Sequence, residues 1–343
     1  MAKISLIVPD YLGENRIFSL EHRDDCFVGF RLLRDEFSKR GVSFDSSDVC
    51  PQDDVDMYVF LDDTTRIHRQ CTRKNIKKIC FLFESPFIAT ANYTAAISGN
   101  FNKVFSWHVD YCEQFENWEK IDFSQNLVVN ERCFESRKRK FSVLVCSAKR
   151  QGHGNPLNLY GFRHDLVEYC ESNQNLKFDL YGVGWEKRTV FDIDFVGTGR
   201  LRKILMLFLP TLSPPKCYRG IVDAKLPVMS EYDFAFCSEN YRGPMGYITE
   251  KIWDAMMAGC IPVYHGAHLQ NGIIPRDLYI DPDDFPNFSE LFLYLESITE
   301  QEKLQWQLRI KCFLNEMANS PFDARYFAKT ACRSIMNEFE EAG

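Results

Sequence analysis

The stretch from Tyr232 to Gly266 constrains the fold more than any other part of this 343-residue chain. Its first residues, Tyr232 to Cys237, alternate aromatic and small apolar side chains, which predicts a β-strand. A loop rich in glycine and proline follows, and Thr249 is a good N-cap for a helix with apolar residues at helical spacing. A second short strand is predicted from Ile261 to Tyr264. This strand–loop–helix–strand order is typical of a parallel sheet flanked by helices.

Polar side chains gather where the first of these strands ends. In open α/β sheets, ligands bind beyond the carboxyl ends of the strands, where helix N-termini offer N–H groups to anions. Lys251 falls in the first turn of the predicted helix, where the helix dipole disfavours a cation unless an anion lies against it. A phosphate group is therefore the expected occupant of this place. The polar residues there are Ser238, Glu239, Asn240, Tyr247, Glu250 and Lys251.

The composition is that of a globular protein large enough for two domains, with 45% hydrophobic and 26% charged residues. The net charge of −7 argues against nucleic acid as a partner, because binding a phosphate backbone requires a concentrated basic face. The basic run from Arg137 to Lys140 is interpreted as a solvated linker.

Cysteine usage and hydropathy indicate a compartment. The 13 cysteines form neither a C-x-x-C pair nor a zinc-like spacing, which favours reduced, buried thiols. No apolar run approaches the roughly 20 residues that span a bilayer, and no secretory signal is visible. We therefore expect a soluble cytoplasmic protein without a transmembrane segment, and peripheral attachment to a membrane stays open.

Two α/β domains are expected, over residues 1–138 and 139–320. In the first, strands are predicted at Ile4–Val8, Met57–Leu61, Lys78–Phe83 and Val104–Trp107, and a helix at about Cys26–Arg40. In the second, strands at Phe141–Cys146 and Phe178–Tyr181 flank a helix at about Tyr160–Glu171. The C-terminal segment 321–343 carries the apolar stripe of an amphipathic helix, which we expect to pack back across a domain surface.

Several motifs are better explained by structure than by chemistry. Gly182-Val-Gly184 and Gly197-Thr-Gly199 lack the third glycine of a dinucleotide loop. The acidic turns Asp192-Ile-Asp194 and Asp281-Pro-Asp283-Asp284 are interpreted as solvated turns, and the pair His265 and His268 has no third metal ligand near it in sequence. Glu84 ends a predicted strand and precedes Ser85-Pro86. Taken alone, it fits a structural turn and a catalytic carboxylate equally well.

The chain resembles the α-1,3/4-fucosyltransferases of glycosyltransferase family 10. The resemblance lies in a phenylalanine-rich strand ending in Glu-Asn, a Tyr-x-Thr-Glu-Lys segment and an Ala-Gly-x-x-Pro-Val-x-x-Gly segment. The matching residues here are Phe234-Ala-Phe236, Glu239-Asn240, Tyr247-Ile-Thr-Glu-Lys251 and Ala258 to Gly266. In the first half of the chain, Glu84-Ser85-Pro86 is nearly all that matches.

The resemblance implies a GT-B fold, in which two Rossmann-like domains face each other across a cleft, and an inverting reaction with GDP-fucose as donor. It implies neither a metal nor any other cofactor. By position, Arg163 and Lys251 would stabilise the departing GDP, and Glu84 would be the general base. The remaining donor-side positions that it implies are Glu239, Asn240 and Glu250, with Lys225 and Tyr247 matched less closely.

These expectations amount to a bacterial or viral fucosyltransferase that acts on O-3 of an N-acetylglucosamine or glucose unit. Protein glycosylation and the synthesis of lipopolysaccharide glycans are the processes that such an enzyme would serve. Two alternatives stay open. One is a transferase of the same fold that uses another nucleotide sugar, and the other is a catalytically silent module that binds glycans.

Overall fold

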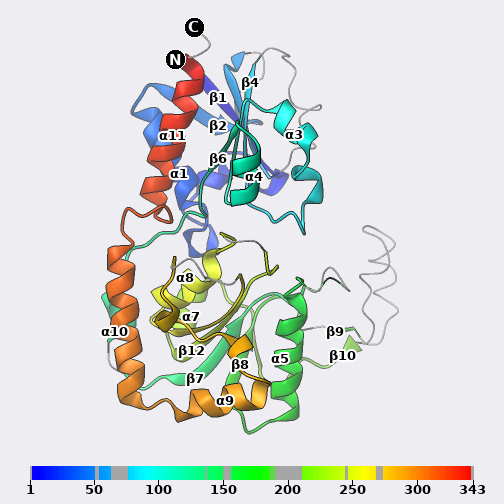
Figure 1. Ribbon diagram of the computed structural model, residues 1–343, viewed down its shortest axis with the longest axis vertical. Helices are drawn as coiled ribbons and strands as arrows, with labels where there is room; N and C mark the ends of the chain where they lie inside the picture. Colours follow the sequence, from blue (N-terminus) through cyan, green and yellow to red (C-terminus); the bar gives the residue numbers. More distant parts are fainter. Residues whose placement is uncertain are drawn as a thin grey trace. The chain divides into compact units, whose positions relative to one another are not determined.

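The computed structural model describes residues 2–50, 54–62, 76–135, 137–149, 155, 157–186, 188–189, 211–243, 246–267 and 273–340. These residues form two compact units (Figure 1). Unit 1 comprises residues 1–128, 243–250 and 315–343, and unit 2 comprises residues 129–242 and 251–314. These limits differ from the expected domains 1–138, 139–320 and 321–343, because the C-terminal residues and the short segment 243–250 cluster with unit 1.

Unit 1 is built on a six-stranded sheet in the order β2-β1-β3-β4-β5-β6, in which every pairing is parallel. Because β1 pairs with β2 on one side and β3 on the other, the connections reverse direction between β1 and β3. This is the topological switch point of the sheet. The strands are β1 (Ala2–Ile7), β2 (Val42–Ser46), β3 (Met57–Leu61), β4 (Lys77–Leu82), β5 (Lys103–Ser106) and β6 (Trp118–Lys120).

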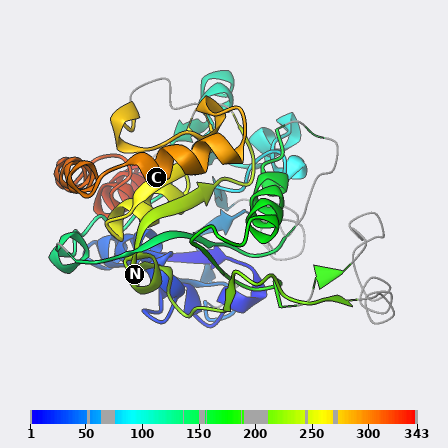
Figure 2. The same cartoon turned by 90° about the horizontal axis from the view of Figure 1, so that it is seen from below.

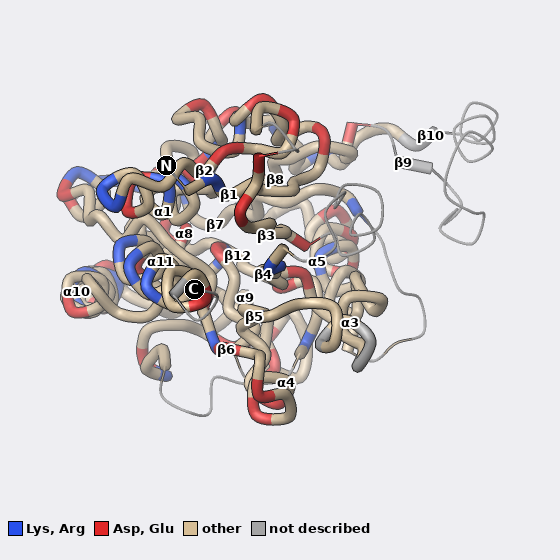
Figure 3. The backbone as a smooth tube through the Cα atoms, turned by 90° about the horizontal axis from the view of Figure 1, so that it is seen from above, with Lys and Arg blue, Asp and Glu red and all other residues tan. Residues whose placement is uncertain are grey.

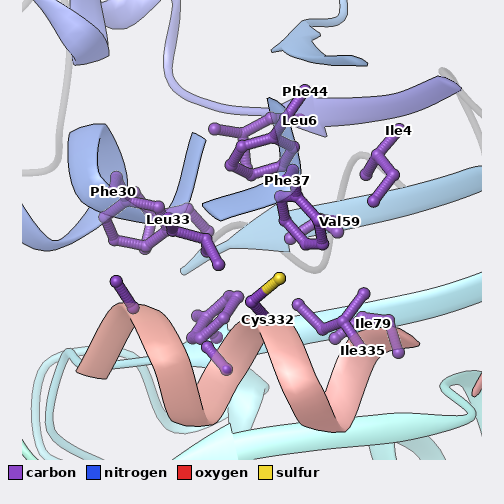
Figure 4. Close-up of a cluster of buried hydrophobic side chains, with 14 of the residues drawn as sticks. Ile4, Leu6, Phe30, Leu33, Phe37, Phe44, Val59, Ile79, Cys332 and Ile335 are labelled. Carbon is purple, nitrogen blue, oxygen red and sulfur yellow. The ribbon is translucent and has the colours of Figure 1, made fainter. Parts of the chain in front are cut away.

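One face of this sheet is covered by helix α1 (Val28–Ser38) and helix α11 (Ala324–Glu340), which lie side by side (Figures 1 and 4). Cys332 and Ile335 of α11 belong to the same buried cluster as Phe30 and Leu33 of α1. Lys and Arg lie along α11 (Figure 3), and those at positions 325, 329 and 333 are exposed. The expected C-terminal amphipathic helix therefore exists, and its apolar stripe completes the core of unit 1.

The opposite face of the first sheet has a second core. Its buried residues include Tyr58 and Phe60 of β3 and Trp118 of β6. Helix α3 (Ala95–Asn100) contributes Ile97, and Tyr111 of helix α4 (Val109–Gln114) packs against the cluster. Short 3-10 helices in the loops of this unit span Asp10–Leu12, Arg16–Phe18, Arg23–Asp25 and Thr90–Asn92.

Unit 2 is built on a five-stranded parallel sheet in the order β11-β8-β7-β12-β13. Here β7 pairs with β8 on one side and β12 on the other, so the switch point lies between β7 and β12. The strands are β7 (Lys140–Val145), β8 (Phe178–Tyr181), β11 (Tyr218–Gly220), β12 (Tyr232–Ser238) and β13 (Ile261–His265). A separate antiparallel pair joins β9 (Arg188–Thr189) to β10 (Thr211–Leu212).

Helices cover both faces of the second sheet, as a doubly wound fold requires (Figure 2). Helices α5 (Tyr160–Ser172) and α9 (Phe288–Ser297) share one buried cluster with Phe234 and Phe236 of β12. Side chains alternate along a strand, so Asp233 points to the other face, where its carboxylate pairs with Lys303 of helix α10 (Glu300–Glu316) at 2.8 Å. The remaining elements are α7 (Lys225–Met229), α8 (Glu250–Met257) and the 3-10 helices Glu131–Phe134, Arg276–Leu278 and Pro282–Asp284.

The predicted α/β class and the strand–loop–helix–strand unit are confirmed, with β12, α8 and β13 in the expected order. Each predicted strand of the first half is present within one or two residues of its expected limits. Strand β2 and helices α9 and α10 were not predicted. No helix among the described residues is long and apolar enough to cross a membrane. The motif residues Asp192, Asp194, Gly197, Gly199 and His268 lie outside the described residues.

Candidate functional site

The switch point of the second sheet brings the predicted donor residues of unit 2 to one edge. Strands β7 and β12 pair in register there, with Leu144 opposite Phe236. Helix α5 follows β7 and carries Arg163 in its first turn, while Glu239 and Asn240 directly follow β12. Helix α8 carries Lys251 in its first turn. Residues that are far apart in the sequence thus meet where a ligand of an open α/β sheet is expected.

Arg163 is almost completely buried and binds the end of β12. One of its terminal nitrogens donates to the carbonyl oxygens of Ser238 and Glu239, at 2.6 and 3.1 Å, and to Oδ1 of Asn240 at 2.8 Å. Its Nε is also buried and has no hydrogen-bond partner within the described part of the chain. Arg163 therefore fixes Glu239 and Asn240 in place and also brings a positive charge to the edge of the sheet.

Glu239 is fully buried and forms the centre of a small polar network. Its carboxylate accepts a hydrogen bond from Nζ of Lys251 at 3.0 Å and one from the Tyr264 hydroxyl at 3.4 Å. Lys251 keeps about a fifth of its side chain exposed, so its ammonium group is both paired and accessible. Together Arg163, Lys251 and Glu239 leave one net positive charge at this edge. Such an arrangement favours an anionic ligand.

Lys225 has a different environment from Lys251. Its ammonium group pairs with the carboxylate of Asp254 at 2.7 Å, and both side chains are about one-eighth exposed. Asp254 lies one turn after Lys251 on α8. The structure therefore places Lys225 beside the helix that carries Lys251, with its charge largely offset by Asp254.

The Gly182-Val-Gly184 motif has a steric explanation at the neighbouring strand end. Gly182 has a φ of 135°, and a Cβ at this position would lie 1.9 Å from the carbonyl oxygen of Cys146. Only glycine allows the chain after β8 to approach β7 this closely. Trp185 completes the contact, because its indole N–H donates to the same carbonyl at 2.9 Å. The motif thus shapes the strand ends and needs no nucleotide to explain it.

Glu84 lies at the carboxyl edge of the first sheet, two residues after β4, and its backbone is held on both sides. The carboxylate of Asp62 accepts hydrogen bonds from the backbone N–H groups of Phe83 and Glu84, at 2.7 and 2.9 Å. The indole of Trp107 donates to the Phe83 carbonyl at 2.9 Å, and the Tyr93 hydroxyl donates to the Glu84 carbonyl at 2.7 Å. Three side chains from three different segments therefore fix the turn from which the Glu84 carboxylate projects.

Tyr247 clusters with unit 1, although its motif continues into α8. The centroid of its ring lies 4.8 Å from that of Trp107 and 5.9 Å from that of Phe123. Trp107 is the residue whose indole donates to the Phe83 carbonyl. Gly246 makes this approach possible, since its φ is 102° and a Cβ there would lie 2.9 Å from the Trp107 carbonyl oxygen. Glu250, partly buried, opens α8 within the same unit. Tyr247 and Glu250 are thus assigned to unit 1, and Arg163, Glu239, Asn240 and Lys251 to unit 2.

Sequence reasoning missed Asp62, Tyr93, Trp107, Asp254 and Tyr264. A signal existed for Asp62, because it directly follows the apolar strand β3 just as Glu84 follows β4. Burial raises the pKa of the Asp62 carboxyl to about 7, since the two backbone hydrogen bonds only partly offset it and the Glu84 charge adds to it. For Tyr93 and Trp107 no local signal existed, because their contacts with the Glu84 turn are tertiary.

The acidic residues of the turn that begins at Asp281 form ion pairs. Asp283 pairs with Arg242 at 2.5 Å, and its other oxygen lies 3.3 Å from Nε2 of His265. Asp284 pairs with Arg276. Within the described ranges, no group of three or more His, Cys, Asp and Glu side chains gathers as a metal site would require.

Comparison with protein families agrees with the motifs in unit 2. Residues 173–338 match the family model described as glycosyltransferase family 10 (fucosyltransferase), C-terminal part. The resemblance to glycosyltransferase family 10 is confirmed. The match includes Glu239, Asn240 and Lys251 and extends into α11, whereas Glu84 and Arg163 precede it.

The chain also has curated relatives. It is 41% identical over 73 residues to mouse alpha-(1,3)-fucosyltransferase 4, and 37% identical over 76 residues to the alpha-(1,3)-fucosyltransferase FucT of Helicobacter pylori. These matches cover 20% and 22% of this chain but only 17% and 16% of the relatives. The similarity is thus confined to a short region.

Solved structures extend the comparison to most of the chain. A crystal structure of an alpha1,3-fucosyltransferase with GDP-fucose aligns with a TM-score of 0.51 and 15% identity, over 90% of this chain and 81% of that one. The Anabaena protein HepE, with UDP and glucose, aligns with a TM-score of 0.57 and 10% identity, over 98% of this chain and all of that one. At such identities the comparison establishes the fold. The two Rossmann-like units have the GT-B fold.

Proposed function

We propose that this protein is an inverting fucosyltransferase that moves L-fucose from GDP-fucose to a hydroxyl of a glycan. One observation carries the proposal. The Glu239–Lys251 pair and Arg163 lie together at the switch point of the second sheet, inside or next to the segment that matches family 10. The match of residues 173–338 to the fucosyltransferase family model supports the proposal.

The cations would act on the leaving group. When the fucose–phosphate bond breaks, negative charge develops on the GDP diphosphate, and a site with a net positive charge stabilises it. Lys251 and Arg163 supply that charge, while Glu239 orients Lys251. The donor side includes Asn240 and Lys225 as well, with Tyr247 and Glu250 on the loop before α8. On this account neither a metal nor any further cofactor takes part.

Glu84 would be the general base. Inversion by direct displacement requires the acceptor hydroxyl to lose its proton as it attacks, and a positioned carboxylate can take that proton. The backbone on either side of Glu84 is fixed by Asp62, Trp107 and Tyr93. Tyr247, which belongs to the donor motif, packs on Trp107 and so connects that motif to the Glu84 turn.

The acceptor class is inferred from relatives. A mouse relative that is 37% identical over 81 residues is named 4-galactosyl-N-acetylglucosaminide 3-alpha-L-fucosyltransferase 9. The match covers 22% of that protein, so its acceptor is carried over only as a proposal. We propose O-3 of an N-acetylglucosamine or glucose unit. A cytoplasmic location is part of the proposal, because the described cysteines are all free thiols.

Donor binding tests the proposal directly. Titration calorimetry should give the highest affinity for GDP-fucose, a lower one for GDP-mannose, and little or none for UDP-glucose. Pocket shape alone separates similar sugars by about 1–3 kcal/mol, so a difference of about 10-fold or more is expected between the two GDP-sugars. A preference for a UDP-sugar would show that the donor is a UDP-sugar and not GDP-fucose. Tight glycan binding without turnover of any donor would favour a catalytically silent module.

A further inference from the structure

Asp62 lies at the switch point of the first sheet. It directly follows β3, whose neighbour β1 marks the reversal of connections, and it adopts a left-handed backbone conformation with a φ of 54°. Its backbone carbonyl accepts a hydrogen bond from the side chain of buried Asn92 at 2.6 Å. The left-handed conformation is costly for a residue other than glycine, and such strain concentrates at functional sites.

The Asp62 carboxylate is tied directly to the Glu84 turn. A single oxygen, Oδ1, accepts from the N–H groups of both Phe83 and Glu84. These two peptide groups precede the Glu84 side chain, so their position determines where its carboxylate lies. The Glu84 charge contributes to the raised pKa of Asp62. Both carboxylates in turn contribute to the raised pKa of the Tyr93 hydroxyl, after its burial. Tyr11, in the 3-10 helix Asp10–Leu12 after β1, also interacts electrostatically with Asp62.

We propose that Asp62 is a positioning residue for Glu84, which fixes the backbone of the Glu84 turn and, through its own negative charge, makes Glu84 a stronger base. This inference rests on the proposed role of Glu84 in fucosyl transfer. Two carboxyl groups that share a site ionise in two steps, because the first charge opposes the second. Burial, together with the Glu84 charge, raises the pKa of Asp62 to about 7, so Asp62 carries its negative charge beside Glu84 only above that pH.

The variant Asp62→Asn separates the charge from the hydrogen bonds. Its amide oxygen can still accept from the two N–H groups, but it has no negative charge. We expect kcat/KM for fucosyl transfer to fall by about 10-fold at pH 8 and to approach the wild-type value near pH 5.5, where Asp62 is protonated. GDP affinity should stay within about twofold of wild type.

The control is Asp56→Asn at the other end of β3, where Asp56 accepts the Lys3 backbone N–H at 2.8 Å. It should leave the pH profile unchanged.

Stability provides an independent readout. Because burial raises the pKa of Asp62 in the folded protein, ionising it opposes folding between its unfolded pKa, near 4, and about 7. The wild type should therefore lose stability relative to Asp62→Asn as the pH rises through this window, and the variant should be at least as stable at pH 8. A variant with lower activity and equal or higher stability fits a functional role and contradicts a purely structural one.

Two measurements need no turnover. Hydrogen exchange should show slow amide exchange at Phe83 and Glu84 in the wild type and in Asp62→Asn, and faster exchange in Asp62→Ala. Carboxyl carbon NMR should show that Glu84→Gln lowers the apparent pKa of Asp62. If the wild type transfers fucose but Asp62→Asn keeps its full pH profile, the proposal for Asp62 is wrong while the proposed function stands. If the wild type transfers no sugar, unchanged exchange in Asp62→Ala or an unmoved Asp62 pKa would overturn it separately.

Discussion

Glu84 and Lys251 are the two residues on which the proposed chemistry depends most, and each is held by a different kind of contact. Glu84 is positioned through its backbone, by Asp62, Trp107 and Tyr93. Lys251 is positioned through its side chain, by the buried carboxylate of Glu239. Substitutions of the two therefore have different effects on stability.

Glu84→Gln should remove catalysis without disturbing the fold. The amide keeps the size of the side chain and can still accept the Ser85 N–H, which Oε1 of Glu84 accepts at 3.0 Å, but it cannot take a proton. We expect kcat to fall by about 10²–10⁴-fold, with GDP-fucose affinity within a few-fold of wild type. Near-normal kcat would show that the base lies elsewhere. Loss of donor affinity as well would make Glu84 a structural residue.

Lys251 requires a double-mutant cycle, because removing it alone leaves the Glu239 carboxylate buried without its cation. Lys251→Met should destabilise the protein by about 3 kcal/mol, and adding Glu239→Gln should restore most of that stability. GDP affinity should stay reduced by about 10²-fold in both variants, because the diphosphate has lost its cation. Thermal unfolding and calorimetry with GDP report the two effects separately. Recovery of GDP affinity in the double variant would mean that Lys251 serves only to neutralise Glu239.

Among the helices, α11 lies near the end of the sequence but packs against residues of the first half of the chain. Phe327 lies in the first turn of α11. The centroid of its ring is 5.6, 5.7 and 6.2 Å from the ring centroids of Phe30, Phe81 and Phe83. Phe83 is the residue directly before Glu84. The C-terminal helix therefore supports the sheet edge from which the proposed base projects.

Phe327→Ala should destabilise unit 1 by about 3–5 kcal/mol, because it opens a cavity between α11, α1 and β4. The matched control is Tyr326→Ala, since Tyr326 is the next aromatic residue on the same helix and is 40% exposed. That change should cost less than about 1 kcal/mol. Denaturant unfolding measures both. Equal effects of the two substitutions would contradict the assignment of α11 to the core.

The sequence predicted most strands of both sheets because their apolar runs are short, continuous and bounded by polar residues, as fully buried parallel strands require. Strand β2 escaped prediction because its partly buried Ser43 and Asp45 interrupt the apolar run. Helix α10 is polar on most of its surface and reaches the core through residues such as Gln307 and Lys303, which no hydrophobic pattern marks. Predictions of the donor residues depended on motif spacing, whereas the contact of Tyr247 with Trp107 depends on tertiary folding.

In the whole molecule, the proposed reaction needs only side chains of this chain. The cations at the second sheet's switch point would neutralise the diphosphate without a divalent ion. The carboxylate at the edge of the first sheet would supply the base. Both assignments place the reacting groups at the carboxyl ends of parallel strands, where α/β sheets bind their ligands.

Chelation tests the first assignment. Fucosyl transfer should continue at an unchanged rate in excess EDTA, because Arg163 and Lys251 neutralise the diphosphate without a metal. Adding Mn²⁺ or Mg²⁺ should raise the rate by less than about twofold. Loss of activity in EDTA, with recovery on adding either ion, would contradict the role of the two cations. It would indicate a metal site, for which the acidic turns are the candidates.

A glycan array incubated with the protein and labelled GDP-fucose tests whether the protein transfers fucose from GDP-fucose. We predict label on glycans that present an unsubstituted O-3 of N-acetylglucosamine or glucose, and none on the same glycans when Glu84→Gln replaces the wild type. An array that stays unlabelled with GDP-fucose but gains sugar from another nucleotide donor would contradict the account.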